Sequence, residues 1–495
     1  MWVNFGRNLQ SRNHTNCLPL GNHSWFGGPE QYRQLWPVQK LTFSNHALVT
    51  HNVSNQGIAD AFWFNSRGVA VLVDRAVPLF IDQNTSRSRD SLCLISKIAT
   101  PYRPREALVL AYKIGYHKDA KQAFLRSVND YLGKPSGIPD ERMIKYPIWS
   151  TWALYKADIN ETTVRSFAAD IKKHGFQNSQ LEIDDDWEEC YGSITWNTQK
   201  FPDIRKLVRD LKRDDFRVTL WTHPFVNKNC FQYKILKDKN FLVRNENGTE
   251  TSWWNAWNNQ AGIIDFTNWE AAKDFVERQK KNLEYTGIDG LKFDAGETAW
   301  MPALPFLNIP LSPYEDYPSH HTNEYLRAVA KFGGLTEVRT AYWTQDLPIF
   351  LRMIDKDTKW GYQNGLKTLI TTLLQMNMVG YPLVLPDMIG GNVYGDDVLK
   401  RELFIRWLQA NTFMPALQFS RVPWEFDDDK SNRVSTYTTA ELSSLIDSTN
   451  SSRIPDSRNC TALLSTPRQS HRFDRGAYEE FDEVRHTREP SYLVE

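Results

Sequence analysis

A short apolar run that ends in carboxylates gives this sequence its first candidate for chemistry. Asp294 and Glu297 follow Gly290–Phe293, which has the pattern of a strand. Cleavage of a glycosidic bond needs two carboxyl groups, one ionised beside the anomeric carbon and one holding a proton for the leaving oxygen. Asp294 is the better candidate for the ionised group, because Lys292 lies on the same side of the strand and favours an anion. A carboxylate that only caps the turn after the strand is the alternative.

Metal-assisted hydrolysis is the rival chemistry. Asp184, Asp185 and Asp186 end a second apolar run, and together with His223 and Asp294 they could hold a divalent cation. Histidine is scarce, however, at 11 residues, and the sequence has no His-x-His or His-Glu-x-x-His pair. It also has no Ser-His-Asp arrangement and no glycine-rich phosphate loop. We therefore expect neither a metal ion nor another cofactor.

The elements that must position these residues alternate between strand and helix from about residue 145 onwards. The expected strands are 147–153, 179–183, 217–221, 290–293, 337–342, 382–385 and 413–419. The expected helices are 160–174, one beginning at Pro202, 268–285, 321–332, 364–377 and 397–410. Alternation over roughly 280 residues implies a parallel sheet, and its length fits a (β/α)8 TIM barrel. An open doubly wound sheet is the alternative, although no Gly-x-Gly-x-x-Gly motif follows an early strand.

A TIM barrel carries its reactive groups at the C-terminal ends of the strands. The polar and aromatic residues that end the expected strands are therefore candidates for the site. They are Trp152, Asp184, Asp185, Asp186, His223, Lys292, Asp294, Glu297, Arg339, Trp343, Asp387, Gln418 and Ser420.

Two further regions flank the expected barrel, which we place at residues 141–426. Residues 1–140 contain short β-type runs, such as Gly68–Val73 and Leu108–Tyr112, broken by Gly, Asn and Pro, and they predict an antiparallel β-sandwich. Residues 427–495 are rich in Ser, Thr, Asp and Arg with little periodicity, which predicts a polar, largely disordered tail.

Composition excludes some partners and favours others. The 59 Lys and Arg residues balance 59 Asp and Glu residues, so the charge gives no reason to expect nucleic acid or an anionic membrane as a partner. The 18 tryptophans suit a carbohydrate site, because the C–H face of a pyranose packs on an indole, although most tryptophans fill cores.

Sequons and cysteines favour the secretory pathway, meaning the endoplasmic reticulum lumen or the extracellular space. Asn-X-Ser/Thr sequons start at Asn13, Asn22, Asn52, Asn84, Asn160, Asn247, Asn450 and Asn459. The five cysteines lack Cys-x-x-Cys spacing, and our hypothesis pairs Cys17 with Cys93 and Cys190 with Cys230, leaving Cys460 unpaired. Buried free cysteines are the alternative.

The start of the chain shows no signal peptide, and no run of 18 apolar residues occurs. A luminal protein needs an entry signal, so we expect the true start to be missing. Membrane anchoring, if any, is expected only through that missing segment. The sequence makes no prediction of the oligomeric state.

Taken together, the segment Leu291–Glu297, the acidic strand end Leu181–Asp185 and the stretch Asp355–Leu366 resemble glycoside hydrolase family 31. Within the family the likeness is greatest to the myogenesis-regulating glycosidase branch, and it runs from about residue 17 to about residue 425. The resemblance implies an α-linked oligosaccharide or glycan as the substrate, and it implies C-terminal β domains that this sequence lacks.

The resemblance also assigns the second carboxyl group. The nucleophile of the family lies in a Lys-x-Asp-x-x-Glu context, which Lys292, Asp294 and Glu297 match. The acid/base Asp of the family precedes a Trp by five residues, which fits Asp355 and Trp360. Asp357 is the nearby alternative for the acid/base.

Further positions match residues that line the sugar site of the family. They are Trp221, Arg339 and Asp387, with Asp184 and Asp185 gripping sugar hydroxyls. To these we add Trp152, Lys292, Glu297 and Trp360 as candidates for binding substrate.

Two departures from the family pattern bear on specificity. Ile354 stands where the family has a Gly before the acid/base Asp, and Gln418-Phe419-Ser420 stands where it commonly has Arg-x-His. Loss of that cation and imidazole changes which hydroxyls can be bound. This argues against ordinary α-glucosidase specificity, and the resemblance to the branch implies a retaining exo-acting α-glycosidase that prefers an α-galactoside to an α-glucoside. The alternative is a catalytically impaired barrel that acts as a carbohydrate-binding or regulatory protein.

Overall fold

The computed structural model describes residues 2–8, 13–51, 54–104, 108–248, 260–308 and 318–426. The expected polar tail and Cys460 lie outside these residues. Among the helices within these ranges, none has the length and apolar character needed to cross a membrane.

The N-terminal part consists of two antiparallel sheets. One has the order β1 (Trp2–Asn8), β9 (Val109–Tyr116), β6 (Val69–Val73), β5 (Phe62–Asn65) and β3 (Trp25–Gly27). The other has the order β2 (Asn13–Pro19), β8 (Ser91–Lys97), β7 (Leu79–Gln83) and β4 (Phe43–Ala47). Val71 and Leu110 of the first sheet share one buried core with Ile81 and Leu94 of the second. The predicted β-sandwich is confirmed.

The catalytic candidates sit on a second sheet of eight parallel strands. In spatial order these are β18 (Val384–Leu385), β17 (Phe350–Arg352), β16 (Glu337–Val338), β15 (Gly290–Phe293), β12 (Val218–Thr222), β11 (Gln180–Ile183), β10 (Ile148–Ser150) and β19 (Gln418–Phe419). Just past β18, the backbone N–H of Ile389 donates to the carbonyl of Gln418 at 2.9 Å, which brings the two ends of the sheet together. The predicted (β/α)8 barrel is confirmed, and the open doubly wound sheet is wrong.

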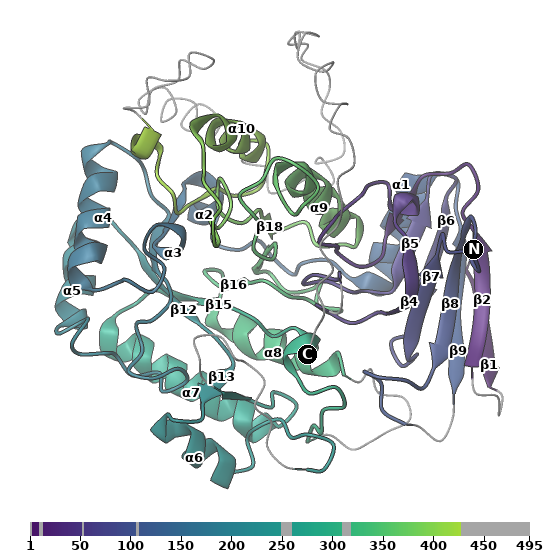
Figure 1. Cartoon of the computed structure of the whole chain (residues 1–495), viewed down its shortest axis with the longest axis horizontal. Coiled ribbons are helices and arrows are strands. Elements are labelled where there is room, and N and C mark those ends of the chain that lie inside the picture. The colour runs from purple at the N-terminus through teal and green to yellow at the C-terminus, as the bar shows by residue number, and fades with distance from the viewer. Residues whose placement is uncertain are drawn as a thin grey trace. The chain divides into compact units, whose positions relative to one another are not determined.

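Helices surround the barrel strands (Figure 1). They are α4 (Glu161–Lys173), α5 (Ile204–Arg213), α7 (Trp269–Thr286), α8 (His320–Val329), α9 (Leu366–Met378) and α10 (Arg401–Asn411), with the short α3 (Trp152–Tyr155) directly after β10. A hairpin of β13 (Phe225–Asn227) and β14 (Ala261–Ile263), with α6 (Phe231–Asp238) between them, is inserted after β12. The short helices α1 (Ala120–Ser127) and α2 (Glu141–Lys145) lie between the sandwich and the barrel in sequence.

The helix α4 illustrates why these segments fold as they do. Val164, Phe167, Ala168 and Ile171 recur at helical spacing and are all buried. The side chain of Asn160 accepts a hydrogen bond from the backbone N–H three residues later, and this cap fixes the start of the helix. The helix after β11 starts later than expected, because Asp203 rather than Pro202 caps α5.

The strand β17 was missing from the sequence prediction. Expected strand 337–342 shrinks to Glu337–Val338, and β17 follows with no α-helix in between. The prediction relied on strict alternation of strand and helix, so it passed over a three-residue strand that no α-helix separates from β16.

Both predicted disulfides form. Cys17–Cys93 joins the paired strands β2 and β8, and Cys190–Cys230 joins the loop after β11 to the start of α6. The alternative of buried free cysteines is therefore wrong for these four residues.

The asparagines of the sequons differ in exposure and in structural role. Asn13, Asn22 and Asn247 are exposed, whereas Asn84 donates both amide hydrogens to backbone carbonyls and Asn160 caps α4. The remaining sequons, at Asn52, Asn450 and Asn459, lie outside the described residues.

Candidate active site

One arginine that the sequence analysis did not single out joins the two candidate catalytic carboxylates. Asp294 follows β15 directly, and Asp355 lies three residues after the end of β17. The guanidinium of Arg352, the last residue of β17, donates from Nη2 to Asp294 Oδ1 at 3.2 Å and from Nη1 to Asp355 Oδ1 at 2.9 Å. A single planar cation therefore holds both carboxylates at the same end of the barrel.

Arg352 also contacts two deeper carboxylates, and exposure separates them from the first two. Its Nη1 lies 3.1 Å from Asp387 Oδ1, and its Nε lies 3.1 Å from Glu337 Oε1. The side chains of Asp387 and Glu337 are only 0% and 2% exposed, whereas those of Asp294 and Asp355 are 19% and 27% exposed. A substrate can therefore reach Asp294 and Asp355, while the other two support the arginine.

The charges around Asp294 and Asp355 favour two anions. Burial alone would raise both pKa values, but Arg339 and Arg352 outweigh it and hold the pKa of each carboxyl below its ordinary value. The indole Nε1 of Trp221 adds a hydrogen bond to Asp294 Oδ2 at 3.0 Å. In the unliganded site, both carboxyl groups are therefore ionised at neutral pH.

Arg339, which follows β16, ties the pair to Glu297. Its Nε donates to Glu297 Oε1 at 2.6 Å and lies 3.2 Å from Asp294 Oδ1, and its Nη1 lies 3.7 Å from Asp355 Oδ1. The buried carboxylate of Glu297 also accepts a hydrogen bond from the indole of Trp300. Glu297 thus orients the arginine.

Lys292 forms its closest ion pairs with two carboxylates other than Asp294. Its ammonium lies 2.9 Å from Glu182 Oε1 and 2.9 Å from Asp184 Oδ2, and all three side chains are buried. It lowers the pKa of Asp294 less than Arg339 and Arg352 do. The expectation that Lys292 favours the Asp294 anion is therefore confirmed, although two arginines contribute more.

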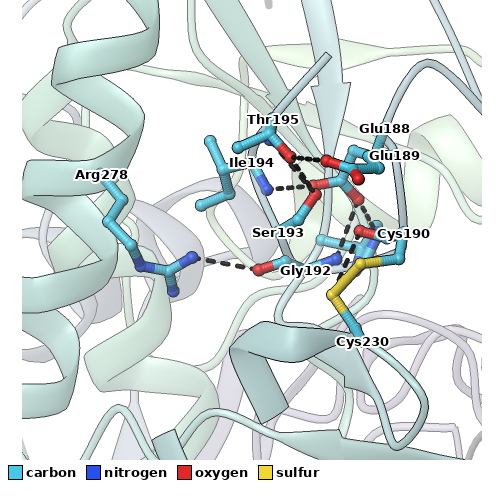
Figure 2. The surroundings of a disulfide bond; sticks show 10 residues. Glu188, Glu189, Cys190, Gly192, Ser193, Ile194, Thr195, Cys230 and Arg278 are labelled. Atoms are coloured by element: carbon cyan, nitrogen blue, oxygen red, sulfur yellow. Dashed lines mark hydrogen bonds and ion pairs between the residues drawn. A yellow bond between two sulfur atoms is a disulfide. The ribbon is translucent and has the colours of Figure 1, made fainter. Parts of the chain in front are cut away.

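The acidic strand end after β11 contributes Asp185 through a rigid loop. The hydroxyl of Tyr191 donates to Asp185 Oδ1, and burial raises the pKa of Asp185 to about 7. Figure 2 shows how the loop is held: the disulfide ties Cys190 to Cys230, and Arg278 of α7 donates to the carbonyl of Gly192.

The side chain of Glu188 forms hydrogen bonds within the same loop (Figure 2). One carboxylate oxygen of Glu188 accepts from the N–H of Gly192 at 2.9 Å, and the other accepts from the N–H of Ile194 at 2.8 Å. These bonds satisfy backbone donors within the turn, so the position of Tyr191 is determined by the fold.

On the opposite side of the site, aromatic residues surround Asp355. The hydroxyl of Tyr394 donates to Asp355 Oδ2, and the indole of Trp152 donates to that hydroxyl at 3.3 Å. The ammonium of Lys156 lies 4.7 Å from the Trp152 ring centroid and 4.6 Å from the Tyr394 ring centroid. Trp152 is thus connected to the candidate acid/base by two hydrogen bonds in series, through the hydroxyl of Tyr394.

Two of the predicted substrate-binding residues, Asp387 and Trp360, lie outside the part of the Asp294–Asp355 site that a substrate can reach. Asp387 is fully buried and accepts from the backbone N–H of Lys356 at 2.6 Å and from Asn392 at 2.8 Å, so it supports Arg352 and the Asp355 loop. Trp360 is 46% exposed, and no contact between its indole and either carboxylate occurs among the described residues.

The neighbouring carboxylate Asp357 has a different partner. It accepts a hydrogen bond from Tyr32 of the N-terminal part at 2.5 Å. Its contacts therefore lead away from Asp294, which favours Asp355 as the acid/base.

The acidic residues proposed for a metal ion are engaged separately. Asp184 pairs with Lys292, Asp185 with Tyr191 and Asp186 with Lys200. In the part of the chain that the structure describes, no group of three or more His, Cys, Asp or Glu residues is arranged to hold a metal ion.

The structure adds Arg352, Tyr394 and Tyr191 to the residues found from the sequence. Arg352 could have been found as the one charge within the apolar run 349–354, which is the pattern of a buried strand. The two tyrosines lie in loops, and no local pattern marks them.

The fold and the paired carboxylates are those of a glycoside hydrolase, and the chain belongs to glycoside hydrolase family 31. The sequence profile of the glycosyl hydrolases family 31 TIM-barrel domain matches residues 145–445. The chain is 34% identical over 421 residues to the myogenesis-regulating glycosidase of Mus musculus, a match that covers 81% of this chain and 58% of that protein.

More distant relatives share the architecture. The SITS-binding protein of Tetronarce californica is 24% identical over 83% of this chain and 58% of its own length, so this chain spans less than two thirds of either curated relative. The solved family 31 sulfoquinovosidase of E. rectale, in complex with an aza-sugar inhibitor, superposes with a TM-score of 0.69 at 16% identity, covering 89% of this chain and 68% of that chain. At that identity the likeness concerns the fold alone.

Proposed function

We propose that this chain is the catalytic part of a retaining exo-acting α-glycosidase, with Asp294 as the nucleophile and Asp355 as the acid/base. The observation that supports this most is the exposure of these two carboxylates, at 19% and 27%, on an arginine whose other two carboxylate partners are buried. Retaining hydrolysis uses carboxyl groups about 5–5.5 Å apart, a separation that one shared guanidinium is suited to hold.

The proposed reaction has two steps. Asp294 attacks the anomeric carbon and forms a glycosyl ester, while the bond to the leaving oxygen breaks and Asp355 gives that oxygen its proton. Asp355 then takes a proton from a water molecule, which attacks the same carbon and releases Asp294. Trp221 and Arg339 orient Asp294 throughout, and Glu297 holds Arg339.

Asp355 must carry a proton for the first step, although Arg352 and Arg339 hold its pKa low in the unliganded site. A bound sugar removes water from Asp355, and burial raises the pKa of a carboxyl group. Because only the protonated form can donate, and because kcat reports the pKa values of the enzyme–substrate complex, we expect kcat to be highest at mildly acidic pH and to fall as the pH rises towards neutrality.

We further propose a preference for α-galactosides over α-glucosides. The proposal rests on Gln418 and Ser420, which stand at positions where the family commonly has a cation and an imidazole. Both are fully buried: Gln418 donates to Glu182 at 3.2 Å, and Ser420 accepts from the backbone N–H of Ala153 at 2.5 Å. Neither offers a charged group to a sugar hydroxyl.

The decisive experiment is a comparison of aryl α-galactoside and aryl α-glucoside hydrolysis by the purified chain. Activity that disappears in Asp294→Asn and Asp355→Asn, with the α-anomer released first in NMR spectra, is the expected result. Release of the β-anomer would contradict retention, and full activity of Asp294→Asn would contradict the nucleophile assignment. A folded wild-type chain that binds sugars without hydrolysing them would instead favour a carbohydrate-binding or regulatory role.

Three parts of the proposal concern the whole protein. We propose domain limits near residues 140 and 426, a location in the secretory pathway and substrates that are α-linked glycans. The location is supported by the two disulfides, which persist in oxidising compartments, and by exposed sequon asparagines at Asn13, Asn22 and Asn247.

A further inference from the structure

A segment of the N-terminal part, here called the brace (described residues 28–51 and 54–60), contacts the barrel next to catalytic candidates. Thr50 Oγ1 accepts from the backbone N–H of Thr298 at 2.8 Å, one residue after Glu297. The hydroxyl of Tyr32 donates to Asp357, two residues after Asp355. These contacts fall on two of the strand ends that form the site.

The third contact of the brace is at Arg339. The carbonyl of Gly57 accepts from the N–H of Ala341 at 2.9 Å and from the hydroxyl of Thr340 at 2.8 Å. Ile58 forms a parallel bridge with Ala341. The backbone of the brace therefore extends the end of β16 directly after Arg339.

Gly57 approaches Arg339 too closely for any other residue. A Cβ atom added to Gly57 would lie 2.1 Å from the backbone oxygen of Arg339. That atom belongs to the main chain, so a larger residue at 57 must displace the backbone of Arg339 or of the brace.

Glu30 fixes Gly57 from the other side. One oxygen of its buried carboxyl group accepts from the N–H of Gly57 at 3.0 Å. The backbone of Glu30 also pairs with both flanking residues, donating to Ile58 and accepting from Gln56 at 2.9 Å each. The close approach to Arg339 is thus set by a buried hydrogen-bonded unit rather than by an exposed loop.

We infer that Gly57, held by Glu30, is a positioning residue for Arg339, so that the N-terminal β-sandwich completes the catalytic centre of the barrel. This inference rests on the proposed function. Arg339 contacts Glu297 at 2.6 Å, Asp294 at 3.2 Å and Asp355 at 3.7 Å, so a shift of its backbone changes all three contacts at once.

The inference predicts a change in pH dependence that loss of packing alone would not cause. The charged groups that face Asp294 are Arg339, Arg352, Lys292 and Asp355. Withdrawing Arg339 leaves the Asp355 charge less opposed, so the pKa values of both Asp294 and Asp355 rise. The acid and basic limbs of the pH profile therefore both move to higher pH.

The test compares Gly57→Ala with Gly6→Ala in the full chain. Gly6 lies in β1, and a Cβ atom added there meets nothing within 4 Å, so it is a matched control. For Gly57→Ala we expect kcat to fall roughly 10- to 100-fold, with KM changing less and the pH profile moving upward, because small displacements of catalytic groups cost about that much. Gly6→Ala should match the wild type in kcat and pH profile.

Two milder variants keep the test decisive if Gly57→Ala does not fold. Thr340→Val removes one of the two bonds to the Gly57 carbonyl, and Glu30→Met removes the side-chain oxygen that accepts from the N–H of Gly57. Folded variants with wild-type kcat and wild-type pH profiles would overturn the inference; smaller shifts in the same direction would support it. If the wild type is active, Asp294→Asn is inactive and Gly57→Ala behaves like the wild type, this inference is refuted and the proposed function is not. If the wild type itself is inactive, the proposed function is refuted.

Discussion

Replacing Arg352 by methionine should destabilise the fold and disturb Asp294 and Asp355, the two proposed catalytic carboxylates. Methionine keeps most of the length and apolar contact of the side chain but removes its charge. Four carboxylates lose their shared cation, and two of them, Glu337 and Asp387, are buried. Removing one partner of a buried ion pair costs about 3–5 kcal/mol, because the remaining charge is left without compensation.

The cost of losing Arg352 falls on its aspartate partners rather than on Glu337. Burial raises the pKa of Glu337 to about 8, so it is mostly protonated at neutral pH and loses little with Arg352. Asp294 and Asp355 have pKa values held below the ordinary 3.8, so their contribution to stability is present above pH 3.8 and is lost as the pH falls through their folded values. The deficit of Arg352→Met should therefore be full near pH 7 and smaller near pH 3.

Urea unfolding at both pH values measures this, with Arg406→Met as the control. Arg406 pairs with Glu402 on the surface of α10, with 46% and 31% of the side chains exposed, so its loss should change the free energy of unfolding by less than about 0.5 kcal/mol. The pH profile of kcat/KM should move upward in Arg352→Met only. If that variant keeps the wild-type free energy of unfolding within about 1 kcal/mol and the wild-type pH profile, Arg352 does not hold the carboxylates.

Three more substitutions test other contacts. Burial raises the pKa of Asp185 to about 7, so the wild type should lose stability as the pH rises from about 4 to 7. Melting temperatures of Asp185→Asn, measured across the same pH range, should lack this part of the decrease. Replacing both Cys190 and Cys230 by serine should lower the free energy of unfolding by about 2–4 kcal/mol in urea titrations and raise KM, and an unchanged KM would show that the disulfide loop does not shape the site. Trp221→Phe removes one hydrogen bond to the Asp294 anion, so kcat should fall roughly 10- to 100-fold while the circular dichroism spectrum stays that of the wild type.

The sequence predicted most of the fold because its signals are local. The buried stripe of α4 and its Asn160 cap lie within one segment, and the alternation of such segments indicates a barrel. The strand β17 was missed because it follows β16 without an intervening helix, so the local alternation of strand and helix does not indicate it. Among the residues that contact Asp294 and Asp355, Arg339 was predicted because it follows a strand, and Trp221 was predicted from the family resemblance. Arg352 was missed together with its strand β17, and Tyr394 was missed because it lies in a loop.

The positively charged side chains around Asp294 show which interactions cannot be predicted from the sequence of one strand. Lys292 is two residues from Asp294 and on the same strand, but its ammonium reaches across the barrel to Glu182 and Asp184. The charges that contribute most to keeping Asp294 ionised come from β17 and from the end of β16, strands whose register only the closed barrel defines. In a barrel, neighbours in sequence point to alternate faces, while the groups that fill the centre come from different strands. The electrostatics of Asp294, the proposed nucleophile, are therefore a property of the assembled barrel, and of the brace that we propose positions Arg339 from outside it.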